Sequence, residues 1–330
     1  MTRIPISQRG PVDMHVHLVG NGLKGSGAWL RPGFMHRLLA GFMLRQIGLR
    51  THWNHQDFDE DYVGLLIRWL RESAISHAVL LAHDEVYDDK GRKLDFGSFH
   101  IPNDYLLKVC AEHPEFLPAV SIHPGRPDAM DALEQALEAG AVMMKCLPNC
   151  HNIDTRLPSY RRFWERMAAA GMPLLAHTGG EHTVPVCAPA LASPAALTGA
   201  LEAGITVIAA HCATRSGARD PDYLPLLVSM MNEWPRLYAD ISALNLPIRS
   251  AGLKFMLQRP DLHPRLVHGS DFPVPVQPRW AKMRGIISSA EATRCRKIKN
   301  LLARDHRLKE AMGFPPSVFT GIWDILRVST

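Results

Sequence analysis

The sequence predicts an α/β protein folded as a (β/α)8 TIM barrel, with long loops after several strands and extra helices at the C-terminal end. Short apolar runs alternate along the chain with helical patterns, which is typical of repeated βα units around a parallel sheet. The chain has 330 residues, of which 46% are hydrophobic. That length suits one barrel with insertions, because such a barrel typically needs about 250 residues.

Eight apolar runs are expected to form the strands. They span residues 12–19, 77–83, 117–123, 141–147, 173–179, 205–211, 236–242 and 265–271. Seven helices are expected between them, over residues 61–73, 104–112, 128–139, 160–170, 194–203, 223–233 and 249–258. Several end on a glycine just before the next strand, as at Gly140 and Gly204, and glycine commonly terminates helices. Eight strands with seven intervening helices suit a closed barrel better than an open sheet.

We expect a single domain over residues 1–330. Long connections follow the first, second, fourth and fifth predicted strands, over residues 20–57, 84–103, 148–158 and 180–192. Loops that follow barrel strands lie at the C-terminal face, where active sites are built. The first of them, 20–57, is expected to form a cap insertion with a helix around 34–47. Residues 277–330 are expected to add the last helices against the outside of the barrel.

The net charge of +5 and the pI of about 8.9 raise the question of a nucleic-acid partner. Most of the excess lies between Arg279 and Lys309, in a stretch that also has an amphipathic helical pattern, and no nucleic-acid-binding motif accompanies it. The N-terminus lacks the apolar segment of a secretory signal, and no apolar run approaches about 18 residues. We expect a cytoplasmic protein with a small-molecule substrate and neither a nucleic-acid nor a membrane partner. Assembly into a homo-oligomer stays open.

A His-x-His pair lies in the first predicted strand. Alternate side chains of a strand share a face, so His15 and His17 can hold one ion. Four more candidates end the fourth, fifth, sixth and eighth apolar runs, namely Lys145, His177, His211 and Asp271. The carboxyl ends of barrel strands lie on one face, so all six side chains are expected to converge there as a divalent-metal site.

With these residues in this order, the chain resembles the amidohydrolase superfamily, in particular its TIM-barrel metal-dependent hydrolases, a branch that also contains decarboxylases. The resemblance runs from Asp13-Met14-His15-Val16-His17 through His268-Gly269-Ser270-Asp271-Phe272-Pro273 to the tail at 307–314. It implies that His15, His17 and Asp271 bind the more buried ion, while His177 and His211 bind a second ion or contact the substrate. Zinc is the expected metal, with one or two ions per chain.

In two-metal members of the superfamily, a carboxylated lysine at the end of the fourth strand bridges the ions, and Lys145 stands at that place. An unmodified ammonium would be repelled by two dications and has no lone pair to donate, whereas a carbamate offers two anionic oxygens. The resemblance therefore favours a carboxylated Lys145. The alternative is one metal with Lys145 as an ammonium that binds substrate. Decarboxylating relatives use a single ion, so the number of metals stays open.

Residues that follow the ligands are candidates for substrate contacts. Glu181 and His182 come soon after His177, and Arg215 follows His211 and could anchor a substrate carboxylate. We predict Glu181, His182 and Arg215 as substrate-binding residues.

Other histidines and cysteines are given supporting roles. His83 and His123 end the second and third strands and are expected to support the site rather than bind metal. Cys146 and Cys150 lack the second ligand pair that a structural zinc site needs. Cys146 should point outward, because it adjoins Lys145 in the strand.

The expected function is metal-dependent hydrolysis of a small ester, lactone, amide or related bond. A bound metal lowers the pKa of water toward about 7. Asp271 would take the proton and pass it to the leaving group, while His211 or a metal would polarise the scissile carbonyl. Two alternatives stay open: a metal-dependent decarboxylase of a small carboxylic acid, and a non-catalytic metal-binding protein.

Overall fold

The computed structural model describes residues 1–329, apart from the side chains of residues 34–36 and 39. Eight parallel strands form its central sheet, and each falls on one of the predicted apolar runs. They are β2 (Val12–His17), β4 (His77–Leu81), β6 (Phe116–Val120), β7 (Met143–Cys146), β8 (Leu174–Ala176), β9 (Val207–Ala209), β10 (Leu237–Asp240) and β11 (Leu266–Val267). The predicted TIM barrel is confirmed.

The barrel closes between β2 and the segment that follows β11. The Met14 amide donates to the His268 carbonyl at 3.0 Å, and the His17 amide donates to the Phe272 carbonyl at 2.9 Å. Gly269 makes this approach possible, because a Cβ at that position would lie 2.6 Å from the His15 Cβ. The strands that carry the first and last predicted ligands are therefore neighbours across the seam.

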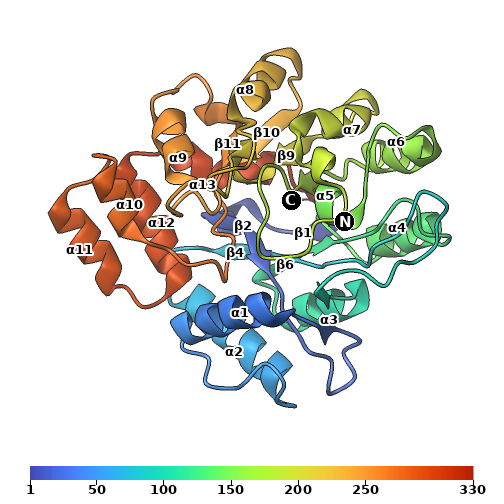
Figure 1. The fold of residues 1–330 in the computed structure, drawn as a ribbon, viewed down its shortest axis with the longest axis horizontal. Helices are drawn as coiled ribbons and strands as arrows, with labels where there is room; N and C mark the ends of the chain where they lie inside the picture. Colours follow the sequence, from blue (N-terminus) through green and yellow to red (C-terminus); the bar gives the residue numbers. More distant parts are fainter. Residues whose placement is uncertain (330) are drawn as a thin grey trace.

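A ring of helices surrounds the strands (Figure 1). Its members are α2 (Phe58–Arg71), α3 (Asn103–Glu112), α4 (Ala129–Glu138), α6 (Arg161–Ala169), α7 (Thr198–Glu202), α8 (Leu224–Glu233), α9 (Ser250–Leu257) and α12 (Leu301–Met312). None of the described helices is long and apolar enough to cross a membrane.

The helix predicted over 194–203 is split. A 3-10 turn, Pro194–Leu197, precedes α7. The Thr155 hydroxyl donates to the Ala196 carbonyl at 2.6 Å and accepts from the Ala200 amide at 3.3 Å. This side chain replaces the backbone bond that a continuous helix would form between those two residues.

The C-terminal segment only partly follows the prediction. Helices α10 (Pro278–Met283) and α11 (Ser289–Lys297) lie outside the barrel with α12 (Figure 1). After α13 (Pro316–Thr320), however, Ile322 and Trp323 join the buried apolar cluster inside the barrel, and the Trp323 indole donates to the Gly10 carbonyl at 2.8 Å. The chain ends by pairing β12 (Val328–Ser329) with β1 (Thr2–Arg3). The last residues thus fill the amino end of the barrel rather than only covering its outside.

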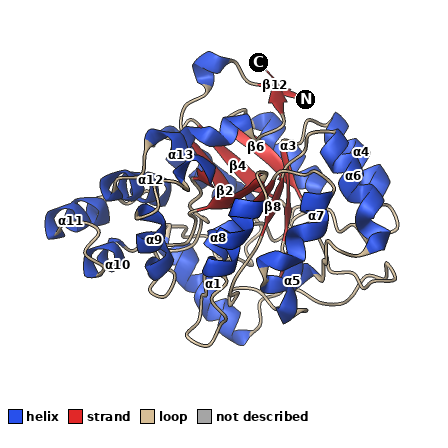
Figure 2. Cartoon of the chain, turned by 90° about the horizontal axis from the view of Figure 1, so that it is seen from above, coloured by secondary structure: helices blue, strands red, loops and turns tan. Residues whose placement is uncertain are grey.

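The first long loop forms a cap at the opposite end of the barrel from the termini (Figure 2). It contains α1 (Phe34–Gln46), which confirms the predicted cap helix, and β3 (Trp29–Leu30), which pairs with β5 (Phe99–His100) of the second loop. The Asp59 carboxylate at the start of α2 accepts hydrogen bonds from the Asn21 amide at 2.6 Å and the Ser26 hydroxyl at 2.7 Å. The cap is therefore tied to two elements of the barrel. The short helix α5 (Pro148–His151) lies at this same end.

A register shift in β2 sets the direction of the His-x-His pair. Val12 and Met14 face the inside of the barrel, whereas Val16 packs outward against the helices. The pairing of β2 with β4 shifts between Asp13 and Val16. An irregularity of this kind changes which face the following side chains occupy. As a result, Met14, His15 and His17 can all face inward.

A buried ion pair holds α12 against the segment that carries Asp271. The Lys309 ammonium is fully buried, donates to the Gly269 carbonyl at 2.7 Å and pairs with Asp305. Asp305 also accepts a hydrogen bond from the Asn245 amide. These contacts join α12, the loop after β10 and the loop after β11.

Replacing Lys309 with methionine should destabilise the fold. The Lys309→Met variant leaves the Asp305 carboxylate buried without its cation, which typically costs about 3–5 kcal/mol in the free energy of unfolding. Urea denaturation of Lys309→Met measures the loss. Arg307→Ala is the matched control, because Arg307 is an exposed residue of the same helix. An unfolding free energy equal to that of Arg307→Ala would contradict the proposed contribution of this ion pair to stability.

Candidate active site

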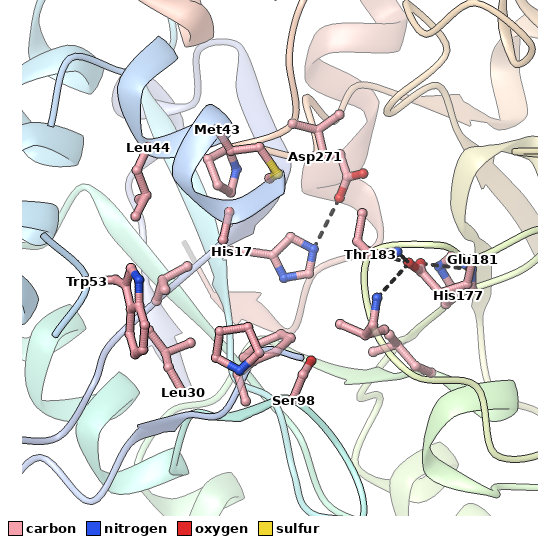
Figure 3. Close-up of a pocket in the computed structure, with 18 of the residues that line it drawn as sticks. His17, Leu30, Met43, Leu44, Trp53, Ser98, His177, Glu181, Thr183 and Asp271 are labelled. Atoms are coloured by element: carbon pink, nitrogen blue, oxygen red, sulfur yellow. Dashed lines mark hydrogen bonds and ion pairs between the residues drawn. The ribbon is translucent and has the colours of Figure 1, made fainter. Parts of the chain in front are cut away.

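The six side chains predicted as metal ligands line one cavity at the carboxyl ends of the strands. They come from β2, β7, the segments after β8 and β9, and the segment after β11, and they are His15, His17, Lys145, His177, His211 and Asp271. The cavity has a volume of about 170 Å³. Figure 3 shows His17 between Asp271 on one side and the cap residues on the other.

Asp271 is the acidic centre of this group. Its Oδ1 lies 3.1 Å from His17 Nε2 and 3.2 Å from His15 Nε2. Burial acts to raise the pKa of this carboxyl, but the two histidine rings outweigh it and hold the pKa below its usual value. Asp271 is therefore a carboxylate, able to bind a cation or accept a proton.

Asp240, at the end of β10, orients two of the predicted ligands. Its Oδ2 accepts a hydrogen bond from His15 Nδ1 at 2.7 Å, and its Oδ1 accepts from the His211 amide at 2.7 Å. Ser242 bridges the same groups: its hydroxyl donates to Asp240 Oδ1 at 2.5 Å and accepts from His211 Nδ1 at 2.8 Å. With both Nδ1 atoms acting as donors, the Nε2 atoms of His15 and His211 are left with lone pairs for the cavity.

The turn that presents His211 has an uncommon backbone. His211, Cys212 and Ala213 have φ values of 58°, 50° and 52°. Left-handed non-glycine residues cost of order 1–3 kcal/mol each and persist where surrounding contacts fix them. Two contacts from Asp240 do so here, since its carboxylate binds the His211 amide and its carbonyl accepts from the Cys212 thiol at 3.0 Å.

His177 follows β8 and lies against Glu181. Its Nε2 is 3.5 Å from Glu181 Oε2 and, among the described residues, has no hydrogen-bond partner although it is buried. Burial lowers the pKa of His177 to about 4, with Glu181 opposing the effect. His177 is thus a neutral imidazole with an unpaired nitrogen in the cavity. Its ring centroid lies 5.0 Å from that of His211.

Lys145 is fully buried in β7. Burial lowers its pKa, against the opposing influence of Asp271, and its Nζ lies 3.1 Å from His15 Nε2. The adjacent Cys146 belongs to the cluster between strands and helices, so its outward direction is confirmed. A lysine with a lowered pKa has a larger neutral fraction, which is the form that reacts with carbon dioxide.

The donor set fits a divalent cation. One donor atom each from His15, His211 and Asp271 lies within 4.8 Å of the others. Burial lowers the pKa of His15 and of His211, so both rings are neutral, and neutral imidazole with carboxylate is a common ligand combination for zinc. The unpaired His177 Nε2 is a further buried donor for the same space. His15, His17, His177, His211 and Asp271 would hold the ion.

Of the three residues predicted to bind substrate, only Glu181 lines the cavity. His182 is exposed and pairs with Asp220 at 3.0 Å. Arg215 is exposed at the surface and is not among the described cavity-lining residues. The backbone turns away from the cavity after His177 and after His211. His182 and Arg215 therefore lie outside the cavity although they are close to these residues in the sequence.

Sequence patterns did not indicate Arg249, a buried arginine of this region. Its guanidinium donates to the Thr214 carbonyl at 2.8 Å and to the Gly180 carbonyl at 2.6 Å. It therefore joins the loops after β8 and β9 from behind, beside Glu181. A break in the apolar pattern at Asp240 could have indicated that residue, because it is the fifth residue of the seventh run, as Lys145 and His177 are of theirs.

His83 and His123 lie in a separate buried cluster. His83 Nε2 is 3.1 Å from His151 Nε2, and His123 Nε2 donates to the His151 carbonyl at 2.9 Å. Neither is among the described residues that line the cavity. They pack beside the site and do not hold its ligands directly.

Comparison with known proteins gives the family. Residues 12–293 match the model of the amidohydrolase family designated Amidohydro_2. The chain belongs to this amidohydrolase family. The matched region contains all six predicted metal ligands. No curated protein matches the sequence.

Solved structures with the same fold include a hydrolase and a decarboxylase. A Pseudomonas putida protein provisionally named 2-pyrone-4,6-dicarboxylic acid hydrolase is 17% identical, with coverage of 96% of this chain and 94% of its own and a TM-score of 0.54. The 5-carboxyvanillate decarboxylase of Sphingomonas paucimobilis is 10% identical, with coverage of 97% and 100% and a TM-score of 0.55. The IDCase of Metarhizium anisopliae in its apo form is 13% identical, with coverage of 96% of both chains and a TM-score of 0.54. At these identities the likeness establishes the fold, and the family assignment supports an enzyme.

Replacing Asp240 with asparagine should weaken metal binding while the barrel stays folded. An amide is a weaker acceptor for His15 Nδ1, and loss of such an outer contact typically costs 10–100-fold in metal affinity or activity. Competition with a chelating dye measures the affinity, and circular dichroism checks the fold. His15→Ala should lose more affinity, because it removes a ligand.

His182→Ala is the control for this experiment, since His182 is an exposed histidine outside the cavity. It should bind metal as the wild type does. Wild-type affinity in Asp240→Asn, or a loss in His182→Ala equal to that in His15→Ala, would show that the ligand set is misassigned.

Proposed function

We propose that this amidohydrolase-family protein is a metal-dependent hydrolase of a small, uncharged ester, lactone, amide or related bond. The observation that carries the proposal is the Asp271 carboxylate, which lies beside His15 and His17 at one side of a small cavity. A divalent ion, with zinc as our expectation, would lower the pKa of a water molecule there toward about 7. Asp271 is placed to take the proton from that water.

Each residue has a distinct task in this proposal. Asp271 Oδ1 is hydrogen-bonded to His17 and lies beside His15, while Oδ2 has no hydrogen bond from a described side chain and takes the proton. Asp271 then returns the proton to the leaving group. His211, with Nδ1 engaged by Ser242, offers its other nitrogen toward the scissile carbonyl or a metal. Glu181 is the proposed substrate contact, and His182 and Arg215 stay as weaker proposals for a larger substrate.

The charges in the cavity favour hydrolysis over decarboxylation. Asp271 and Glu181 together balance one dication when Lys145 is neutral, because the other two buried charges beside the cavity, the Asp240 carboxylate and the Arg249 guanidinium, offset each other. A substrate carboxylate would add a third anion to a buried site, which is costly without a further cation. Hydrolysis of a neutral bond adds no charge. A protonated Lys145 would supply the missing cation, so the protonation and modification of this lysine bear on the reaction.

We propose that Lys145 is carboxylated and bridges two ions. Its burial lowers its pKa, and the neutral amine can add carbon dioxide to form a carbamate. The carbamate would be a third anion beside Asp271 and Glu181, and two dications would then leave a single excess positive charge. The alternative is a single ion with an unmodified Lys145, and this arrangement would favour decarboxylation.

Isotope labelling distinguishes the two reactions. Hydrolysis in ¹⁸O-labelled water should place one labelled oxygen in the carboxylic acid product, because water supplies that oxygen. Mass spectrometry of the product measures it. Release of carbon dioxide from a carboxylic acid, with no label in the organic product, would refute hydrolysis without contradicting the proposed metal site.

Asp271→Asn should retain much of the metal and lose about 10²–10⁴-fold in kcat, because the amide cannot accept the proton. Metal analysis and steady-state kinetics measure the two effects separately. Asp261→Asn is the control, since Asp261 forms a surface pair with Arg259. A kcat for Asp271→Asn equal to that of the control would rule out Asp271 as the base.

Lys145→Ala should lose activity, and formate or acetate should restore part of it by replacing the carbamate oxygens. Protein prepared in ¹³C-labelled bicarbonate should show a carbamate signal by ¹³C NMR that Lys145→Ala lacks. Lys108→Ala, at an exposed lysine, should keep both activity and signal. A crystal structure with a bare amine facing one ion would contradict the bridge.

A further inference from the structure

The two sides of the cavity differ in chemistry. The ligands and Glu181 form one side. The cap forms the other side with apolar side chains, among them Leu30, Pro32, Ala40, Met43, Leu44 and Trp53. Figure 3 shows Leu30, Leu44 and Trp53 on the side away from His177 and Glu181. A substrate held at the ligands therefore extends toward an apolar wall.

The described residues of that wall provide no charged group. Among the described cap side chains that line the cavity, none is charged. The arginines of the cap are exposed: Arg31, Arg45 and Arg50 are at the surface, and Arg37 donates to the Pro32 carbonyl at 2.9 Å and contacts the Trp53 ring from 6.0 Å. The exposed Arg215 offers no cation to the cavity either.

The size of the cavity limits what can lie there. Its volume of about 170 Å³ is below the roughly 300–1,000 Å³ of sites for drug-sized ligands. A short alkyl chain or a single small ring matches this space. An ionised carboxylate in the same place would lose its water without gaining a partner, and Glu181 on the facing side would repel it.

We propose that the substrate carries a small, uncharged apolar group that packs against the cap, and that the cap excludes substrates with a carboxylate at that position. This inference rests on the proposed hydrolase function, which it makes more specific. Met43, Leu44 and Trp53 are the specificity-determining residues. Anionic substrates of the kind named for some structural neighbours would accordingly fit only with their carboxylates directed away from the cap.

A matched pair of esters tests the proposal. Phenyl pentanoate and the monophenyl ester of glutaric acid have acyl chains of equal length that end in a methyl group and a carboxylate. We expect kcat/KM for the pentanoate to exceed that for the glutarate by about 100-fold or more, because the cap offers the carboxylate no partner. Equal kcat/KM values would overturn the proposal.

Met43→Arg should reverse the preference by at least about 10-fold, because it places a cation at the apolar wall. Leu38→Arg is the matched control: Leu38 is on the same helix, is 60% exposed, and is not among the described lining residues. Circular dichroism checks that both variants fold. A shift in Leu38→Arg as large as that in Met43→Arg would show that surface charge, and not the cavity wall, sets the preference.

Binding of two ketones separates this inference from the proposed reaction. Hexan-2-one and 5-oxohexanoate differ in the same way as the esters and cannot be hydrolysed, and quenching of tryptophan fluorescence reports their binding near Trp53. Preferential binding of hexan-2-one supports the apolar site even if no ester is turned over, in which case only the proposed hydrolysis fails. Equal binding of the two ketones, or tighter binding of 5-oxohexanoate, would overturn the inference.

Discussion

The hydrogen bonds of the Asp240 carboxylate underlie the whole candidate site. One oxygen fixes the His15 ring and the other fixes the His211 amide, so two candidate ligands from different strands share one anchor. Ser242 adds the link to the His211 ring. Because each histidine donates through Nδ1, each presents an Nε2 lone pair to the cavity, and the uncommon turn at His211–Ala213 is held in place. A metal site of neutral imidazoles depends on this choice of tautomer.

The seam of the barrel provides the second constraint. Asp271 reaches His15 and His17 because the segment after β11 pairs with β2, and Gly269 allows the two backbones to come close. Lys309 and Asp305 fix the same segment from the outside. The position of Asp271 therefore depends on α12, which lies away from the cavity, through the buried ammonium of Lys309.

Sequence periodicity was sufficient to find the eight strands and the residues at their ends, because parallel strands of a barrel place their last residues on one face. It could not show that His182 and Arg215 lie outside the cavity, since direction after a strand depends on loop contacts such as those of Arg249. Asp240 was also missed, although this aspartate breaks the apolar pattern of its run at the same position as Lys145 and His177 do in theirs. The role of Trp323 inside the barrel depends on a long-range contact with Gly10 that local pattern does not encode.

The candidate ligands and the apolar wall of the cavity come from different parts of the fold. The ligands come from strand ends, where the seam, the β2 irregularity and Asp240 fix their directions. The apolar wall comes from the cap, which is joined to the barrel through the β3–β5 pair and Asp59. Changes in the cap can therefore alter the shape and charge of the substrate side without moving the ligands. Within one family, this separation gives a physical route by which different caps can be combined with one arrangement of strand-end residues.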